Sequence, residues 1–105
     1  MAIKHYKILI PDSVKISLNQ QLNYIAAEHC QPALALQWLD GIIEAIQSLS
    51  TFPERCAAAP EDFYFKKSHE TTIRHLIYKK SFRIIFTIKK NEVRILSVKH
   101  GARIF

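Results

Sequence analysis

The sequence predicts a single α+β domain over residues 1–105, in which an antiparallel sheet packs on an N-terminal helical hairpin. Two stretches with apolar residues at helical spacing occupy the N-terminal half, and three stretches of alternating side chains follow near the C-terminus. The connections between those three stretches are very short, and the chain length allows one domain. The expected order of elements is β-α-α-β-β-β.

The N-terminal half supplies one strand and both helices. Residues 3–10 (IKHYKILI) have the composition of a strand, and Pro11 ends it. Apolar residues then recur at helical spacing over about 13–28, and a second helical pattern runs from Pro32 to about residue 50. Residues 51–70 are irregular, and a loop of about twenty residues is typical of functional segments.

Three strands are expected over about 71–78, 81–89 and 92–99. Short connections between consecutive strands force antiparallel pairing. The middle strand has one fully apolar face, which we expect to meet the helices; it consists of Phe82, Ile84, Phe86 and Ile88. In the last strand, regular alternation separates Val93, Ile95 and Ser97 from Arg94, Leu96 and Val98.

The alternation predicts a basic outer face of the sheet. It places Arg74 and Arg83 together on the exposed side, with Arg94 beside them, above an apolar floor that includes Leu76 and Ile85. Arginine presents a rigid fork of donors that matches phosphate and carboxylate groups. We therefore expect this face to bind phosphate or an acidic protein segment, the alternative being arginines that only keep the sheet soluble.

Charge is divided unevenly along the chain, whose net charge is +6. Residues 1–65 carry four Lys/Arg against seven Asp/Glu, whereas residues 66–105 carry eleven against two. The basic excess falls on predicted strands and not on a tail. It therefore favours a polyanionic or acidic partner over a merely solvated surface.

Several classes of function find no support in the residues. Cys30 and Cys56 lack metal-ligand spacing and are expected to be reduced thiols. The histidines show no metal-binding spacing, and no phosphate-binding glycine loop is present, so we expect neither a metal nor a cofactor. No signal peptide and no apolar run of about 18 residues is present, so we expect a cytoplasmic protein without membrane contact.

His100 is the candidate acid/base residue, because histidine titrates near neutral pH. The alternative is a structural histidine that is hydrogen-bonded at a strand end.

Five short motifs follow one another along the chain. They are Phe52–Cys56 (FPERC), Ile73-Arg74, Phe82–Phe86 (FRIIF), Val93–Val98 (VRILSV) and His100–Arg103 (HGAR). In this order and spacing they resemble the RelE/ParE superfamily of type II toxins, which includes ParE-like plasmid stabilisation proteins. The resemblance covers essentially the whole chain and implies the fold expected above.

The resemblance implies two different activities on one fold. RelE-like members cut mRNA on the ribosome without a metal, whereas ParE-like members poison DNA gyrase. Both kinds are held inactive in a hetero-oligomer with a cognate antitoxin. Carried onto this chain, the nuclease set would consist of Arg83, His100 and Arg103.

Two departures from the nuclease pattern are visible. Leu76 stands where nucleases have a second basic residue, and Phe105 offers no hydroxyl in place of their C-terminal tyrosine. Three hypotheses stay open: a ParE-type toxin that binds gyrase, a ribosome-dependent endoribonuclease, and a degenerate toxin that only binds its antitoxin. In each, the antitoxin is expected on the face of Arg74, Arg83, Leu76 and Ile85.

Overall fold

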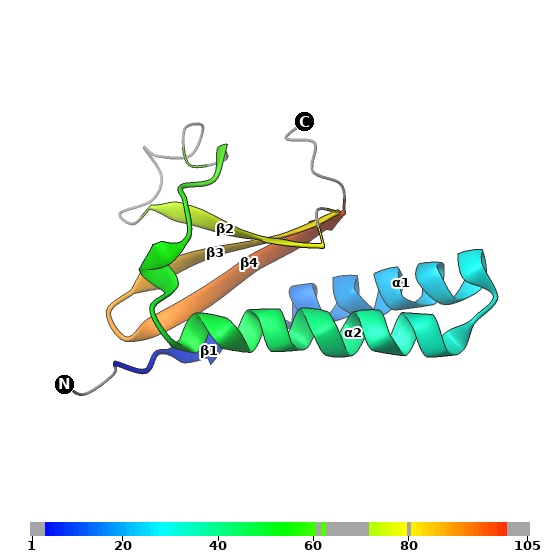
Figure 1. Cartoon of the computed structure of the whole chain (residues 1–105). Coiled ribbons are helices and arrows are strands. Elements are labelled where there is room, and N and C mark those ends of the chain that lie inside the picture. The colour runs from blue at the N-terminus through cyan, green and yellow to red at the C-terminus, as the bar shows by residue number, and fades with distance from the viewer. Residues whose placement is uncertain (1–3, 61, 63–71, 80, 101–105) are drawn as a thin grey trace.

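The computed structural model describes residues 4–60, 62, 72–79 and 81–100. The elements are β1 (Lys7–Leu9), α1 (Asp12–His29), α2 (Pro32–Gln47), β2 (Ile73–Tyr78), β3 (Phe82–Lys89) and β4 (Glu92–His100), with two 3-10 turns, η1 (Ser48–Ser50) and η2 (Pro53–Arg55) (Figure 1). The predicted order β-α-α-β-β-β and the α+β fold class are confirmed.

The strands form one sheet in the order β1-β4-β3-β2. β3 pairs antiparallel with both β2 and β4, as the short connections predict. β1 pairs parallel with the far side of β4, so the complete sheet is mixed. Lys79 and Lys90, in the two turns, have positive φ angles of 50° and 58°, which tight hairpin turns require.

The two helices cover one face of the sheet, and their joined ends extend past it (Figure 1). The core lies between these layers: Ile42 and Ile46 of α2 are fully buried, as are Ile84 and Phe86 of β3. Each such side chain stabilises the fold by about 1.5–3 kcal/mol relative to exposure. Trp38 of α2 belongs to the same core, and its ring lies 5.1 Å from the ring of Phe82.

The strand pairing corrects the predicted outer face. Directly opposed residues on neighbouring antiparallel strands point to the same side of a sheet. Arg74 pairs with Phe86 and therefore lies with Leu76 on the side of the helices. Arg83 pairs with Ile77 on the outer side. The prediction that Arg74 and Arg83 share one face is wrong, because alternation within a strand does not fix the register between strands.

A β-bulge at Leu96 corrects the phase of β4. Ile85 pairs with Ser97 while Phe86 pairs with Ile95, so Leu96 is an extra residue on this strand. Val98 consequently joins Val93 and Ile95 in the core and is only 4 % exposed. The predicted grouping of Val98 with Arg94 and Leu96 is wrong for this reason.

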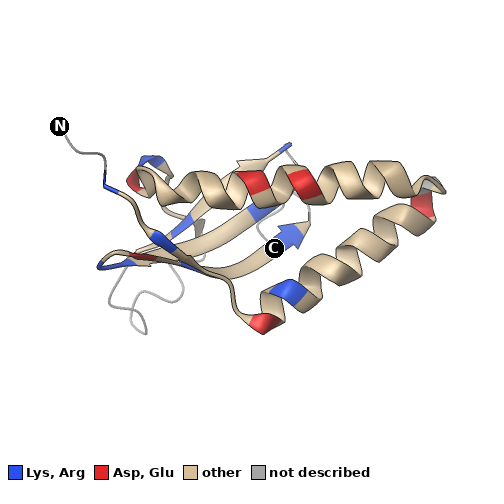
Figure 2. Ribbon diagram, turned by 90° about the horizontal axis from the view of Figure 1, so that it is seen from below, with Lys and Arg blue, Asp and Glu red and all other residues tan. Residues whose placement is uncertain are grey.

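The charge asymmetry corresponds to the two layers (Figure 2). The helices carry one basic residue, Lys15, against the acidic residues Asp12, Glu28, Asp40 and Glu44. β3 and β4 carry one acidic residue, Glu92, against the basic residues Arg83, Lys89, Arg94 and Lys99. Within the described residues, neither helix is long and apolar enough to cross a membrane.

Candidate functional site

On the outer face of the sheet, residues of neighbouring strands pair side by side in rows. One row consists of Ile77, Arg83 and Lys99, and Arg83 is an arginine that the sequence predicts on this face. Arg83 occupies the centre of this row and is only 1 % exposed. Ile85, on the same strand and face, is 3 % exposed. Both lie on the predicted side of the sheet, but the expectation that they form an exposed surface is wrong.

One reason for the burial of Ile85 is visible in the segment before β2. The backbone N–H of Ala59 donates to the carbonyl of Ile73 at 2.8 Å, so this segment runs along the edge of the sheet. Ala59 then packs with Ile73 and Ile85 in a small separate core. The sequence offered no apolar pattern from which this contact could be predicted.

Arg83 lies against His75 of the neighbouring strand. Its Nη1 is 3.2 Å from His75 Nδ1. Because a guanidinium only donates, Nδ1 accepts this hydrogen bond and the ring proton is on Nε2. Sequence reasoning did not single out His75; the strand register alone brings it to Arg83.

The exposed part of the outer face is both apolar and basic. Ile77 is 52 % exposed at one end of the row, and Lys99 is exposed at the other. The bulged Leu96 is 39 % exposed on β4. Arg94 is also exposed and pairs with Glu92 at 3.2 Å. Such a surface suits a segment that combines apolar and acidic side chains.

Arg74 lies on the helical side of the sheet, away from the predicted outer face, and its guanidinium contacts the backbone. Its Nη1 donates to the carbonyl of Cys56 at 2.6 Å and to that of Glu54 at 3.4 Å. These bonds tie the η2 turn to β2. Leu76, on the same face, packs against the main core.

His100 lies on the opposite side of the sheet from Arg83. It pairs with Phe82 across the strands, and the two rings stack at 4.7 Å. The structure therefore does not bring His100 and Arg83 together, and Arg103 lies outside the described residues. Across residues 4–60, 62, 72–79 and 81–100, no group of three or more metal-ligating side chains occurs.

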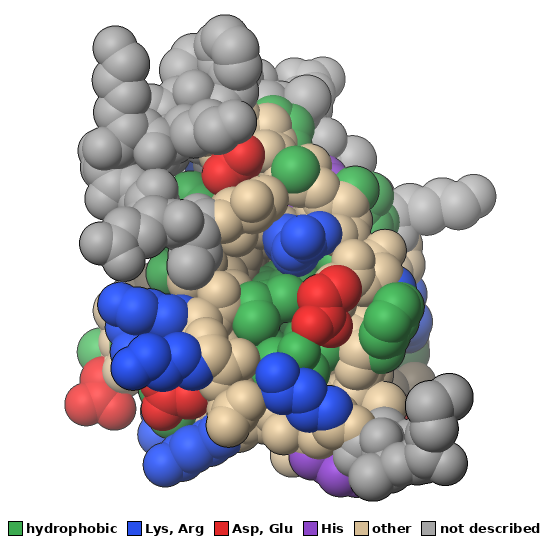
Figure 3. Space-filling model, turned by 90° about the vertical axis from the view of Figure 1, so that its left-hand side faces the viewer, with side chains coloured by type: hydrophobic (Ala, Val, Ile, Leu, Met, Phe, Trp, Pro, Cys, Tyr) green, Lys and Arg blue, Asp and Glu red, His purple; other side chains and the backbone are tan. Residues whose placement is uncertain are grey.

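A polar pair, Tyr6 and Glu54, lies near η2, apart from the outer face of the sheet. Figure 3 shows this end of the molecule, where hydrophobic side chains lie between charged ones. The Tyr6 hydroxyl donates to a Glu54 carboxylate oxygen. This bond raises the pKa of Tyr6, with burial adding to the effect, and it lowers the pKa of Glu54. A cavity of about 440 Å³ adjoins the pair, with Lys4 and Phe52 in its wall.

Comparisons with known proteins agree with this fold. The family model of the ParE toxin of the type II toxin-antitoxin system parDE matches residues 8–105. A chain of the chromosomal ParDE toxin-antitoxin system from P. aeruginosa superimposes with a TM-score of 0.71 at 18 % identity, over 92 % of this chain and 97 % of that one. The search of curated proteins returned no match. The chain therefore belongs to the family of ParE toxins of type II toxin-antitoxin systems.

Proposed function

We propose that this type II toxin acts by binding DNA gyrase and not by cutting mRNA, and that a cognate antitoxin holds it inactive. The proposal rests on the family match over residues 8–105 and on one geometric observation. That observation is the separation of Arg83 and His100 by the sheet.

The separation matters because general acid/base cleavage of RNA needs its groups on one phosphate. The acid/base residue must reach the proton it transfers, and the cation must reach the charge that develops beside it. His100 faces the helical layer, whereas Arg83 is buried on the outer side. The two side chains therefore cannot act on the same phosphate in this arrangement, which favours a toxin that works by binding.

The antitoxin is proposed to cover the exposed outer face. Ile77, Leu96 and Lys99 replace Arg74 and Leu76 in the predicted contact set, and Arg83 and Ile85 support this surface from beneath. An acidic and apolar segment would fit, since it would pair with Lys99 and bury Ile77. We expect this antitoxin segment to be disordered when free and to become ordered when it binds the outer face.

A supercoiling assay with purified gyrase tests the target. The toxin is expected to inhibit supercoiling in a dose-dependent way and to leave a purified mRNA on programmed ribosomes intact. Inhibition should disappear when the antitoxin, identified by its rescue of growth, is added in equal amount. Cleaved mRNA with unaffected gyrase would refute the proposed target.

Charge reversal tests the antitoxin surface. Lys99→Glu should weaken antitoxin binding by about tenfold or more, because it removes an attraction and adds a repulsion. Lys15→Glu is the matched control, since Lys15 is exposed on α1, away from the sheet's outer face. Equal affinity of both variants in titration calorimetry would show that the antitoxin lies elsewhere.

A further inference from the structure

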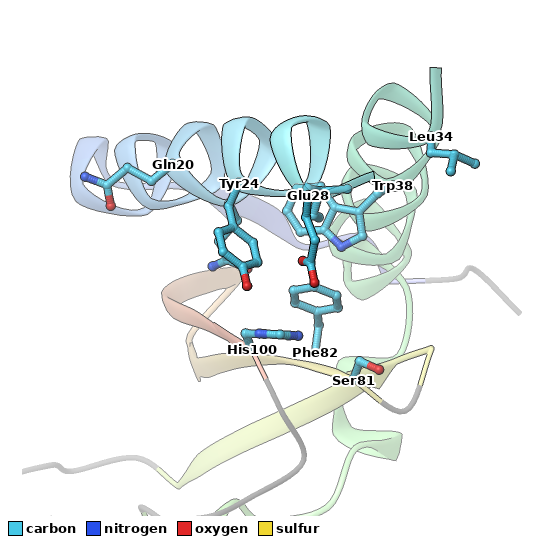
Figure 4. Close-up of a pocket in the computed structure, with 10 residues that line it drawn as sticks. Gln20, Tyr24, Glu28, Leu34, Trp38, Ser81, Phe82 and His100 are labelled. Atoms are coloured by element: carbon cyan, nitrogen blue, oxygen red, sulfur yellow. The ribbon is translucent and has the colours of Figure 1, made fainter. Parts of the chain in front are cut away.

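A cavity of about 530 Å³ lies on the helical side of the sheet, where the joined ends of the helices extend past the strands (Figure 4). Its walls come from α1, α2 and the adjoining ends of β3 and β4. Four ring-bearing side chains surround the space; they are Tyr24, Trp38, Phe82 and His100. Phe82 stacks on His100 and packs against Trp38, so the ring surface that is open to a ligand belongs to Tyr24, which is 60 % exposed, and to His100.

The charge of this cavity is opposite to that of the sheet. Glu28 is the one Asp or Glu in its wall, and no Lys or Arg is found among the described residues that line it. This is notable in a chain with 15 Lys/Arg and a net charge of +6. In Figure 4 the Glu28 carboxylate points into the space between the rings of Tyr24, Trp38 and Phe82.

Two buried polar atoms of the wall have no hydrogen-bond partner among the described residues. They are Trp38 Nε1, a donor on a side chain that is 6 % exposed, and Gln21 Oε1, an acceptor. The orientation of the Gln21 amide is fixed, because its Nε2 donates to the carbonyl of Val98 at 3.1 Å. Buried polar groups in native proteins are normally paired, so a missing acceptor and a missing donor both point to an occupant.

The groups in the wall define the chemistry of that occupant. Aromatic faces and a carboxylate attract a cation, and arginine is the cation that stacks on rings while donating several hydrogen bonds. A guanidinium would donate to Glu28 and Gln21 Oε1. A peptide carbonyl beside it would accept from Trp38 Nε1. An arginine residue within a peptide supplies both, whereas an acidic segment would be repelled by Glu28.

We propose that this cavity binds an arginine side chain presented by a peptide segment of a partner protein. The site is separate from the outer face of the sheet and selects the opposite charge. The inference does not depend on whether gyrase is the target, because it rests on the cavity alone.

Fluorescence titration tests the proposal directly, because Trp38 is the single tryptophan of the chain and lies in the wall. The probe is acetyl-Leu-Arg-Leu-amide, added to the purified full chain without gyrase or antitoxin. The emission is expected to change saturably. The same peptide with citrulline, which keeps the shape but removes the charge, should bind at least about tenfold more weakly.

Substitutions in the cavity wall test whether the arginine peptide binds there. Glu28→Gln should weaken the arginine peptide by about tenfold. Glu44→Gln, a matched change at an exposed position of α2 outside the cavity wall, should leave the affinity unchanged. Tyr24→Ala should also weaken binding, and circular dichroism should show that each variant is folded.

Three results would overturn the proposal. Equal affinity for the arginine and citrulline peptides would exclude recognition of the cation. Free arginine amide binding as tightly as the peptide would exclude a peptide occupant. Self-association of the chain that Glu28→Gln abolishes, measured by sedimentation, would identify a second copy as the occupant in place of a partner protein.

Discussion

The three arginines of the sheet have different roles at the residue scale. Arg74 donates to two backbone carbonyls, Arg83 is buried against His75, and Arg94 pairs with Glu92 at the surface. Their surroundings differ even though all three follow an aliphatic or aromatic residue in a strand. Residue type alone therefore does not separate structural from binding arginines.

Replacing Arg74 should destabilise the fold more than replacing Arg94. Arg74→Ala leaves the carbonyls of Cys56 and Glu54 without this donor and should lower the free energy of unfolding by about 1–3 kcal/mol. Arg94→Ala removes an exposed ion pair and should cost at most about 0.5 kcal/mol. Urea denaturation of both variants measures the difference, and equal costs would contradict the assigned role of Arg74.

The Tyr6–Glu54 hydrogen bond makes stability depend on pH at both ends of the scale. The pKa of Glu54 is lowered from 4.5 on folding, so its contribution is present above pH 4.5 and is lost as pH falls through the folded value. The pKa of Tyr6 is raised from 10.0, so its contribution is present below pH 10 and is lost as pH rises through the folded value.

Tyr6→Phe should flatten both limbs of the pH profile of the melting temperature, and should lower its plateau by a few degrees. Tyr24→Phe removes a hydroxyl that is exposed on α1 and serves as the matched control. The melting temperature of each variant is measured from pH 2 to pH 11. Unchanged limbs in Tyr6→Phe would show that this pair does not control the pH dependence.

At the scale of elements, the bulge at Leu96 decides which side chains of β4 reach the core. Val98→Asp should cost about 3 kcal/mol or more, because it buries a carboxylate in the core without a partner. Ser97→Asp should cost less than about 1 kcal/mol, since position 97 lies on the outer face. Strict alternation from Val93 predicts the reverse order, so unfolding curves of the two variants distinguish the alternatives.

The packing of α2 on β2 depends on Gly41. A Cβ atom at this position would lie 1.9 Å from Tyr78 Oη, so the tyrosine ring must move if alanine replaces glycine. Gly41→Ala should therefore destabilise the chain although alanine favours helix formation. In a Tyr78→Ala background the same change should stabilise it by about 0.8–1 kcal/mol. Equal effects in both backgrounds, measured by a double-mutant cycle, would contradict this contact.

The elements were predictable because each has a local signature. Helical spacing gave both helices to within a few residues, and the short connections gave the two antiparallel pairs. The parallel pairing of β1 with β4 was not predictable, since it joins residues far apart in the chain. The register that separates Arg74 from Arg83 and the bulge at Leu96 also depend on contacts between strands, which no single-strand pattern contains.

The candidate sites were also predictable only in part. The alternation placed Arg83 and Ile85 on the correct face of the sheet but did not predict their burial, and it did not predict that His100 lies on the opposite face. The Tyr6–Glu54 pair joins positions 48 apart in sequence, and the cavity at Trp38 needs both helices and two strand ends. Such sites arise only when the layers pack together.

At the scale of the whole molecule, the outer face of the sheet and the cavity under the helices differ in electrostatic character among the described residues. Basic and apolar side chains are exposed on the outer face, whereas an acidic aromatic cavity opens under the helices. This arrangement suits a protein that works by binding partners at two places. Of the predicted acid/base and cationic residues that the structure describes, His100 and Arg83 lie on opposite sides of the sheet and not around one phosphate.

The most direct test is induction of the chain in growing bacteria, with plasmid supercoiling and mRNA integrity followed in the same culture. The poorly folding Val98→Asp variant serves as the control. A gyrase-binding toxin should alter supercoiling soon after induction while transcripts remain full length. Cleaved transcripts with unchanged supercoiling would contradict the account, because they would show that the chain acts as a nuclease although Arg83 and His100 lie on opposite sides of the sheet.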